Sequence, residues 1–277
     1  MLIALLLLSA AQSEQELKSF LDVRSSLTVT TYAASERGFL VNSQLLVGFE
    51  ECMLVNAQLL RSDAKHTVGM IKTSGKKLTT VFITHDDPDD YLGLEVIHKA
   101  FPDAKIIATP KVAAAIKAHG QKALDERKDK FGSELATTVI VPEAYDKPTL
   151  LFSNNTLQIR ELGSGESDNG SVLYVPALQL IFAGDLVANQ THLWIAAGHA
   201  AGWLKNLETA RGMGAIHTIL PGHGALGPAT LLDDTKAYLQ AFTSAAKNKA
   251  TAVKTMEEKY PSYKLTSALE ESVANLH

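Results

Sequence analysis

The sequence predicts an α/β (α+β) fold in which strand-like and helix-like segments alternate in two comparable halves. The strand-like runs are short and rich in β-branched residues, whereas the intervening segments carry apolar residues at helical spacing. Hydrophobic residues make up 46% of the 277 residues, which is ample for a sizeable core. No Ser/Gly-rich linker divides the halves, so residues 12–277 are expected to form a single domain that ends in C-terminal helices.

The first half is expected to begin with a meander of strands followed by a helix. Apolar and β-branched residues alternate with polar ones, between Gly and Ser breaks, over Leu27–Tyr32, Phe39–Val47 and Cys52–Asn56. Ser62 is a candidate N-cap for a helix over Asp63–Thr73, because a Ser hydroxyl can accept a hydrogen bond from a free N–H group of the first turn.

A strand, an acidic loop and a helix are expected next. Leu78–Thr84 predicts a strand that leads into the loop, and Leu92–Phe101 predicts the helix that leaves it. Ala104–Ala108 then predicts a returning strand. Pro110 suits the first position of the following helix, where its missing N–H would have no intrahelical partner in any case.

The second half is expected to contain two hairpins before its helices. Ser153-Asn154-Asn155 favours a tight turn, so the runs on either side of it are expected to pair, and a second pair is expected around Pro176. The strands of these pairs are Thr149–Phe152 with Thr156–Leu162, and Ser171–Val175 with Gln179–Ala183. A helix is then predicted over Ala201–Arg211 and a strand over Ile216–Leu220, and Pro228–Glu257 is predicted to be mostly helical.

The charge balance argues against a nucleic-acid surface. The chain has 26 Lys and Arg residues against 30 Asp and Glu residues, a formal net charge of −4, and no basic run. A small-molecule substrate is therefore the expected partner, while the oligomeric state carries no signal. The single Cys52 has no partner for an internal disulfide and is expected to pack in the core.

The first 11 residues have features of a secretory signal. Leu2–Leu8 is apolar, and Ser9 and Ala11 suit the small-residue positions of a cleavage site. The run is too short to span a bilayer, so stable membrane insertion is not expected. No Lys or Arg precedes it, which leaves a mis-assigned start or a buried N-terminal strand as alternatives. We expect a mature protein that begins near Gln12 and is periplasmic or secreted, or cytoplasmic if the segment is retained.

The segment Thr84–Asp90 is the densest group of potential metal ligands in the sequence. It reads Thr-His-Asp-Asp-Pro-Asp-Asp and follows an apolar run. Pro88 is expected to keep the segment from folding into a helix. In an extended loop, alternate side chains face one way: His85, Asp87 and Asp89, with Asp90 turned beside them. A solvated acidic turn is the alternative.

Three further motifs follow in order after strand-like runs. They are Gly163-Ser164-Gly165-Glu166-Ser167, Gly184-Asp185 and Pro221-Gly222-His223-Gly224. Together with His85-x-Asp87-x-Asp89-Asp90, these motifs resemble those of the metallo-β-lactamase superfamily, from about Phe39 to Phe242. Two of the three histidines of the H-x-H-x-D-H signature are aspartates here, and Glu166 stands where the third motif usually has histidine. The resemblance is therefore to a divergent member.

The resemblance implies a four-layer αββα sandwich with its chemistry at one edge, where the motif loops converge. It implies a first metal position formed by His85, Asp87, Glu166 and Asp185. It implies a second formed by Asp89, Asp90, Asp185 and His223. Asp185 would bridge the two, and Asp89 would also be the catalytic residue that orients the attacking water. Trp194, in the loop after Gly184-Asp185, is the expected substrate contact.

The implied ligand set predicts one or two divalent metal ions. Two carboxylate charges about 4 Å apart repel by roughly 4 kcal/mol at an effective dielectric constant near 20, so five carboxylates at one edge need neutralisation. Carboxylates in place of imidazoles favour harder ions. Iron or manganese is therefore favoured on ligand type, and zinc is nearly as well suited.

The resemblance implies a metal-dependent hydrolase that attacks an ester, lactone, amide or thioester through metal-bound hydroxide. Two other classes remain open. A carboxylate-containing variant of the site occurs in the flavodiiron branch, where it handles redox chemistry. A non-catalytic ligand- or partner-binding protein with a degenerate metal site is the stronger alternative. His192 or His199, which flank the segment containing Trp194, is also a possible replacement for a lost ligand.

Overall fold

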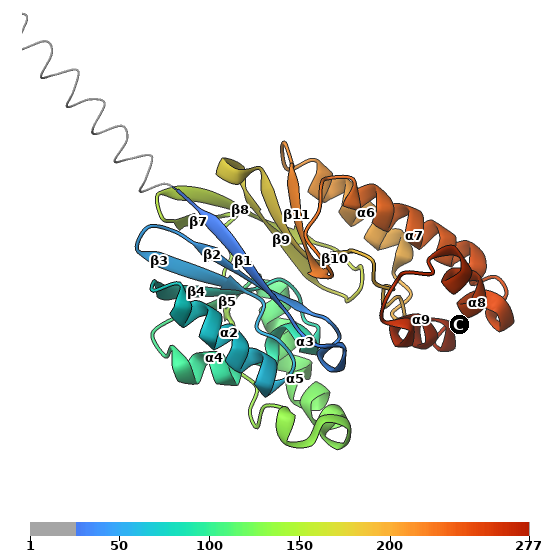
Figure 1. Cartoon of the computed structure of the whole chain (residues 1–277), viewed down its shortest axis with the longest axis horizontal. Helices are drawn as coiled ribbons and strands as arrows, with labels where there is room; N and C mark the ends of the chain where they lie inside the picture. Colours follow the sequence, from blue (N-terminus) through green and yellow to red (C-terminus); the bar gives the residue numbers. More distant parts are fainter. Residues whose placement is uncertain (1–25, 277) are drawn as a thin grey trace, which may run out of the picture.

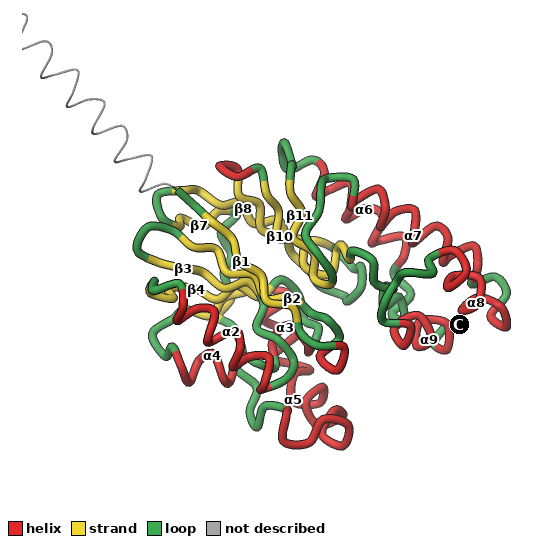
Figure 2. The backbone as a smooth tube through the Cα atoms, viewed as in Figure 1, coloured by secondary structure: helices red, strands yellow, loops and turns green. Residues whose placement is uncertain are grey.

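The computed structural model describes residues 26–276 and has four layers, with two β-sheets packed between two layers of helices (Figure 1). In Figure 2 the strands occupy the middle of the molecule and the helices lie on its two outer sides. The expected αββα sandwich is therefore confirmed. The predicted secretory segment, Met1–Ala11, falls outside the described residues.

The first sheet has six strands in sequence order, antiparallel from β1 to β3 and parallel from β3 to β6. They are β1 (Thr28–Ala33), β2 (Asn42–Val47), β3 (Glu51–Val55), β4 (Lys77–Ile83), β5 (Lys105–Ala108) and β6 (Glu143–Ala144). The second strand begins later than predicted, because Phe39 and Leu40 adopt left-handed backbone conformations with φ of 60° and 58°. The short β6 was not predicted, since two residues carry no periodic pattern.

The second sheet has five strands in the order β11-β10-β9-β8-β7. They are β7 (Thr149–Phe152), β8 (Asn155–Leu162), β9 (Gly170–Val175), β10 (Leu180–Ala188) and β11 (Thr218–His223). Both predicted hairpins are confirmed, and Ser153 and Asn154 make the first turn with φ of 45° and 60°, as a two-residue hairpin requires. β10 and β11 are parallel, so their carboxyl ends lie at the same edge.

Helices cover the outer face of each sheet (Figure 1). On the first sheet lie α2 (Arg61–Thr73), α4 (Leu94–Ala100) and α5 (Pro110–Phe131), with the short α3 (Pro88–Tyr91) near the sheet edge. On the second sheet lie α6 (Ala200–Arg211), α7 (Leu231–Ala245), α8 (Lys249–Lys259) and α9 (Thr266–Ala274). α9 lies beyond the last helical segment that the sequence predicted. The helix predicted over Leu92–Phe101 is present as the slightly shorter α4, whereas α3, which precedes it, was not predicted.

The predicted N-cap of α2 is wrong. The helix begins at Arg61, and Leu60 occupies the N-cap position without a side-chain hydrogen bond. Ser62 therefore lies inside the first turn, where its backbone N–H donates to Oε2 of Glu134 at 3.2 Å. A carboxylate from a distant segment thus satisfies a donor that a local hydroxyl was expected to satisfy.

The two sheets share an apolar core that brings three strand ends together. Phe82 on β4, Phe182 on β10 and Leu220 on β11 are buried in this core. At the edge, a Cβ on Gly184 would lie 2.5 Å from Oγ1 of Thr84, so β10 passes very close to the end of β4. The motifs that follow β4, β10 and β11 therefore converge at this edge.

Two further predictions concern Cys52 and the membrane. Cys52 is buried on β3, between the first sheet and its helices, as predicted. Burial raises the pKa of its thiol to about 11, so the thiolate is disfavoured. Within residues 26–276, no helix is both long and apolar enough to cross a membrane.

Candidate metal centre

The acidic segment leaves β4 and turns into a short helix. His85 still forms a β-bridge, but Asp87 occupies the N-cap position of α3 and Pro88 is its first residue. The prediction of an extended loop is therefore wrong for the second half of the segment. A proline is well suited to the first helical position, so Pro88 starts a helical turn instead of preventing one. Asp89 and Asp90 lie within this turn and do not alternate as they would along a strand.

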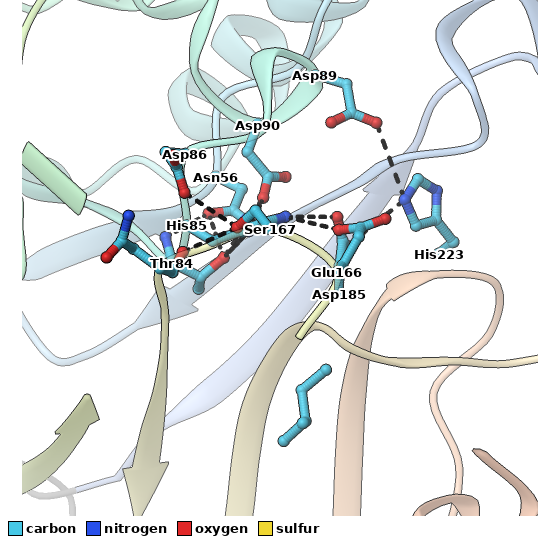
Figure 3. A network of polar contacts seen from close by, with 12 residues as sticks. Asn56, Thr84, His85, Asp86, Asp89, Asp90, Glu166, Ser167, Asp185 and His223 are labelled. Atoms are coloured by element: carbon cyan, nitrogen blue, oxygen red, sulfur yellow. Dashed lines mark hydrogen bonds and ion pairs between the residues drawn. The ribbon is translucent and has the colours of Figure 1, made fainter. Parts of the chain in front are cut away.

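His85 is contacted by carboxylates at both ring nitrogens (Figure 3). Its Nδ1 lies 2.6 Å from Oδ2 of Asp90 and 3.0 Å from Oγ1 of Thr84. Its Nε2 lies 2.6 Å from Oδ2 of Asp185 and 3.1 Å from Oε2 of Glu166. Asp90 is thus on the Nδ1 side of the ring, whereas Asp185 and Glu166 are on the Nε2 side.

The Nε2 side of His85 has the geometry of a metal-binding cluster. One ligand atom each of His85, Glu166 and Asp185 lies within 4.8 Å of the others. These are three of the four residues implied for the first metal position. The fourth, Asp87, is not part of this cluster, and burial and then the nearby charge of Asp89 raise the pKa of its carboxyl group well above the usual range.

His223, at the end of β11, has its Nδ1 bound to the backbone. Nδ1–H donates to the carbonyl oxygen of Phe39 at 2.7 Å, because a carbonyl can only accept. Nε2 faces the acidic groups, 3.4 Å from Oδ1 of Asp185 and 3.8 Å from Oδ2 of Asp89 (Figure 3). Asp185 lies between the two imidazoles, where a bridging ligand is expected. Asp90, also implied for this second position, faces His85 instead.

Burial and crowding shift the pKa values of these groups. Burial and then the charge of Asp185 raise the pKa of Asp89 to about 6, and burial raises the pKa of Asp90 to about 6 against the opposing pull of His85. Burial would lower the pKa of His223, but Asp185 outweighs it and raises that pKa to about 10. Burial also opposes ionisation of Asp185, yet His85 and His223 hold its pKa well below the usual range. Asp185 is therefore the carboxylate that the two imidazoles stabilise most.

Several buried carboxylate oxygens in the site have no hydrogen-bond partner. They are Oδ1 of Asp89, Oδ1 of Asp90 and both oxygens of Asp185. The short contact of Asp185 with Nε2 of His85 is an ion pair without hydrogen-bond geometry. Among the described residues, these carboxylates form ion pairs with histidines and with no Lys or Arg. This donor set fits divalent cations, which would neutralise the carboxylates and use their free oxygens.

Gly222 allows β11 to pass directly beside Asp185. A Cβ at position 222 would overlap Oδ1 of Asp185, so a larger residue would displace the carboxylate. The preceding carbonyl, that of Pro221, accepts hydrogen bonds from Nδ2 of Asn42 at 3.0 Å and Nε2 of Gln44 at 2.9 Å. These side chains come from β2, so the first sheet holds the β11 segment in place.

A cavity of about 300 Å³ opens onto the clustered ligands. Five of the sequence-predicted ligands line it: Asp87, Asp89, Glu166, Asp185 and His223. Trp194 also lines the cavity, and its indole Nε1–H donates to Oε2 of Glu271 on α9 at 3.0 Å. The loop that carries Trp194 is held to the same helix, since the N–H of Ile195 donates to Oγ of Ser272 at 2.7 Å. Trp194 is therefore placed where a substrate can reach it.

Neither alternative histidine lies among the clustered ligands. His192 lines the cavity, but its Nδ1 is 2.7 Å from the hydroxyl of Tyr238. His199 pairs with Asp168, with Nε2 and Oδ1 3.4 Å apart. The structure thus assigns both rings to other partners.

Three contributors to the site were not predicted. The carbonyl of Phe39 fixes the ring of His223, and Arg127 and Lys130 on α5 line the cavity. A backbone carbonyl leaves no signal in a sequence. Charged residues on a 22-residue helix usually indicate a face exposed to solvent. The sequence therefore gave no sign that Arg127 and Lys130 would reach the cavity.

Residues 64–223 match the family model described as the metallo-beta-lactamase superfamily, and this range contains every ligand of the candidate centre. The chain belongs to the metallo-beta-lactamase superfamily. The resemblance seen in its motifs is thereby confirmed. A comparison with curated protein sequences gave no significant match.

Solved structures of metallo-beta-lactamases share the fold of this superfamily member. A metallo-beta-lactamase from Pontibacter korlensis is 20% identical with a TM-score of 0.60, and the match covers 78% of this chain and 99% of that one. The DIM-1 metallo-beta-lactamase is 19% identical with a TM-score of 0.57, and the match covers 77% of this chain and 92% of that one. At these identities the likeness shows the fold alone.

Proposed function

We propose that this protein is a metal-dependent hydrolase that acts on a small carbonyl substrate, namely an ester, lactone, amide or thioester. The observation that carries the proposal is the cluster of His85, Glu166 and Asp185, with His223 and Asp89 next to it. All of these residues except His85 line a cavity of about 300 Å³. Membership of the metallo-beta-lactamase superfamily supports the same reaction class.

The residues present fit two adjacent metal positions. The first would be held by His85, Glu166 and Asp185. The second would be held by Asp89, Asp185 and His223, so that Asp185 is shared. Carboxylates outnumber imidazoles in both sets, which favours iron(II) or manganese, with zinc close behind. Asp87 lines the same wall and remains a candidate additional ligand.

Asp90 is proposed to position His85. A histidine that binds a metal through one nitrogen commonly donates its other N–H to a carboxylate, which fixes the ring and raises its basicity. Asp90 forms an ion pair with Nδ1 of His85 at 2.6 Å and is fully buried, so it is placed to hold the ring in this way. Its role in the reaction would therefore be indirect.

Asp89 is the proposed catalytic residue. A divalent ion bound here would polarise the substrate carbonyl and lower the pKa of a coordinated water towards neutrality. Asp89 lines the cavity and has a buried oxygen without a hydrogen-bond partner, so it is available to orient that water and accept its proton. Trp194 would offer an apolar wall to the body of the substrate.

The test is metal-dependent turnover. Protein purified without chelators or a His-tag is loaded with manganese, iron(II) or zinc in turn and assayed on esters, lactones, thioesters and β-lactams. We expect turnover that requires metal and falls by about 100-fold or more in Asp89→Asn, with the exposed Asp103→Asn as a matched control. Bound metal without turnover on any of these substrates would favour the non-catalytic binding protein. Absence of both would overturn the proposal.

A further inference from the structure

Two cations on the last turns of α5 line the cavity together with the metal ligands. Arg127 and Lys130 are three residues apart, so they lie on the same face of the helix. Arg127 also acts electrostatically on Tyr91 in α3, alongside Asp87, which places its charge close to the acidic turn. These two side chains bring positive charge to a cavity whose other wall carries the carboxylates of Asp89, Glu166 and Asp185.

Neither cation is neutralised by the protein. Among the described residues, Arg127 makes one hydrogen bond, from Nη1 to the carbonyl of Ala123 at 3.1 Å, although a guanidinium has five N–H donors. Nζ of Lys130 lies 5.1 Å from the ring centre of Phe39 and 5.3 Å from that of Phe131. Neither side chain forms an ion pair with a carboxylate in residues 26–276.

Other lysines on the same helix behave differently. Lys122 lies 3.6 Å from Glu126, and Lys128 lies 2.6 Å from Asp125. Lys111, at the start of the helix, lies 2.8 Å from Glu161. Among the described residues, the cations of α5 without an ion pair are therefore Arg127 and Lys130, which line the cavity, and Lys117, which does not. The two unpaired charges at the cavity are available to an anionic ligand there.

The remaining acidic residues of the cavity lining have partners of their own. Glu126 is paired with Lys122, and Glu271 accepts the indole N–H of Trp194. The lining also contains apolar side chains that a ligand body can contact, namely Phe39, Phe131, Leu193, Trp194 and Leu265. A ligand that fits this surface has an anionic head, an apolar body and a polar group that reaches the metal side.

We propose that Arg127 and Lys130 form a carboxylate subsite, and that the substrate is a carboxylate-bearing ester, lactone, amide or thioester whose reacting carbonyl faces Glu166 and Asp185. Arg127 suits a carboxylate because its planar fork can donate two parallel hydrogen bonds. Lys130 adds a second charge, held in place by the two aromatic rings. The carbonyl part of this inference rests on the proposed function, whereas the anion part rests on α5 alone.

The first test measures anion binding without turnover. Glutarate is titrated calorimetrically into the protein, both metal-free and metal-loaded, and the same is done for Arg127→Gln with Lys130→Gln. Loss of charge-assisted hydrogen bonds should weaken glutarate binding by about tenfold or more. The control is Lys117→Gln with Lys128→Gln, which removes the same charge from the same helix at positions that neither line the cavity nor pair with a lining residue, and should leave affinity unchanged. Equal affinities in wild type and the first double variant would overturn the subsite.

The second test compares two esters that differ in charge. The ratio of kcat/KM for mono-4-nitrophenyl glutarate to that for 4-nitrophenyl butyrate should exceed one, and should fall by about tenfold or more in the Arg127→Gln, Lys130→Gln variant. Hydrolysis of both esters with an unchanged ratio would refute the subsite and leave the proposed function standing. If neither ester is hydrolysed, the glutarate titration decides the subsite, and the wider panel of lactones, thioesters and β-lactams decides the proposed function.

A different role for the two cations would also be visible. If they only offset the charge of the acidic ligands, their removal would tighten manganese binding and leave glutarate binding unchanged. That result would overturn the carboxylate subsite.

Discussion

Asp90 contacts Nδ1 of His85 at 2.6 Å, on the side of the ring away from Asp185 and Glu166. A ring held in this way presents Nε2 in one orientation. The last position of the altered signature therefore carries a residue that supports the cluster without joining it. In the proposed centre, Asp185 and Glu166 thus lie on the metal-facing side of His85, and the buried Asp90 supports the ring from behind.

Replacing Asp90 should weaken metal binding without abolishing it. In Asp90→Ala the ring of His85 loses its partner, and metal affinity is expected to fall by about 10- to 100-fold. Asp90→Asn keeps an acceptor oxygen and should lose less. Competition with a metal-binding dye measures both, with Asp185→Asn as the reference for a lost ligand. Unchanged affinity in Asp90→Ala would show that Asp90 has no part in positioning the ring.

Asp89→Asn should have opposite effects in the metal-free and metal-loaded protein. Without metal, the substitution removes a buried charge next to Asp185, so the free energy of unfolding should rise by about 1 kcal/mol or more. With metal, it removes a ligand, so the stabilisation that metal confers should shrink. Urea unfolding with and without a chelator separates the two effects. A loss of stability in both states would contradict the proposed crowding of charge.

Gly222→Ala should damage the centre although position 222 binds no metal. The new Cβ would overlap the carboxylate of Asp185, so we expect weaker metal binding and a loss of about 1–3 kcal/mol in the free energy of unfolding. Gly69→Ala is the matched control, because nothing lies within 4 Å of its Cβ position in α2 and alanine favours a helix. Equal behaviour of the two variants would mean that β11 does not approach Asp185 as described.

The ends of β4, β10 and β11 could be predicted from the sequence because each is a short apolar run followed by a polar motif. Those runs fix which residues meet at the edge, and His85, Asp185 and His223 do meet there. The directions in which the side chains of Thr84–Asp90 point could not be predicted. They depend on whether Pro88 prevents or begins a helical turn, and both are compatible with proline.

The residues that α5 and α9 contribute to the cavity could be predicted even less from the sequence. Arg127 and Lys130 reach the cavity because α5 packs with that face towards the acidic turn, and local spacing does not encode this orientation. The bond from Trp194 to Glu271 likewise depends on where α9 docks. Tertiary packing decides such contacts, so a single sequence does not reveal them.

Glu95 should make stability depend on pH through contacts outside the metal centre. Burial would raise its pKa, but hydrogen bonds from the backbone N–H of Thr137 at 2.6 Å and its hydroxyl at 2.8 Å outweigh burial and lower it. A carboxyl whose pKa is lower in the folded state stabilises the protein above its unfolded pKa, and this stabilisation is lost as the pH falls through its folded pKa.

The measurement for this effect is the difference in free energy of unfolding between wild type and Glu95→Gln. We expect about 1 kcal/mol in favour of wild type near neutral pH, shrinking as the pH falls below about 4. The exposed Glu258→Gln should show no comparable difference. A wild-type advantage that is constant from neutral to acidic pH would show that the charge of Glu95 is irrelevant.

The metal content of the protein shows whether the clustered carboxylates and imidazoles bind ions. Wild type and Asp185→Asn are each reconstituted with manganese, iron(II) and zinc in turn, dialysed, and subjected to elemental analysis. Because Asp185 contacts both imidazoles, we expect one or two ions per wild-type chain with at least one metal, and a large loss in Asp185→Asn. Fewer than about 0.1 ion per wild-type chain with all three metals would mean that His85, Glu166 and Asp185 do not form a metal centre.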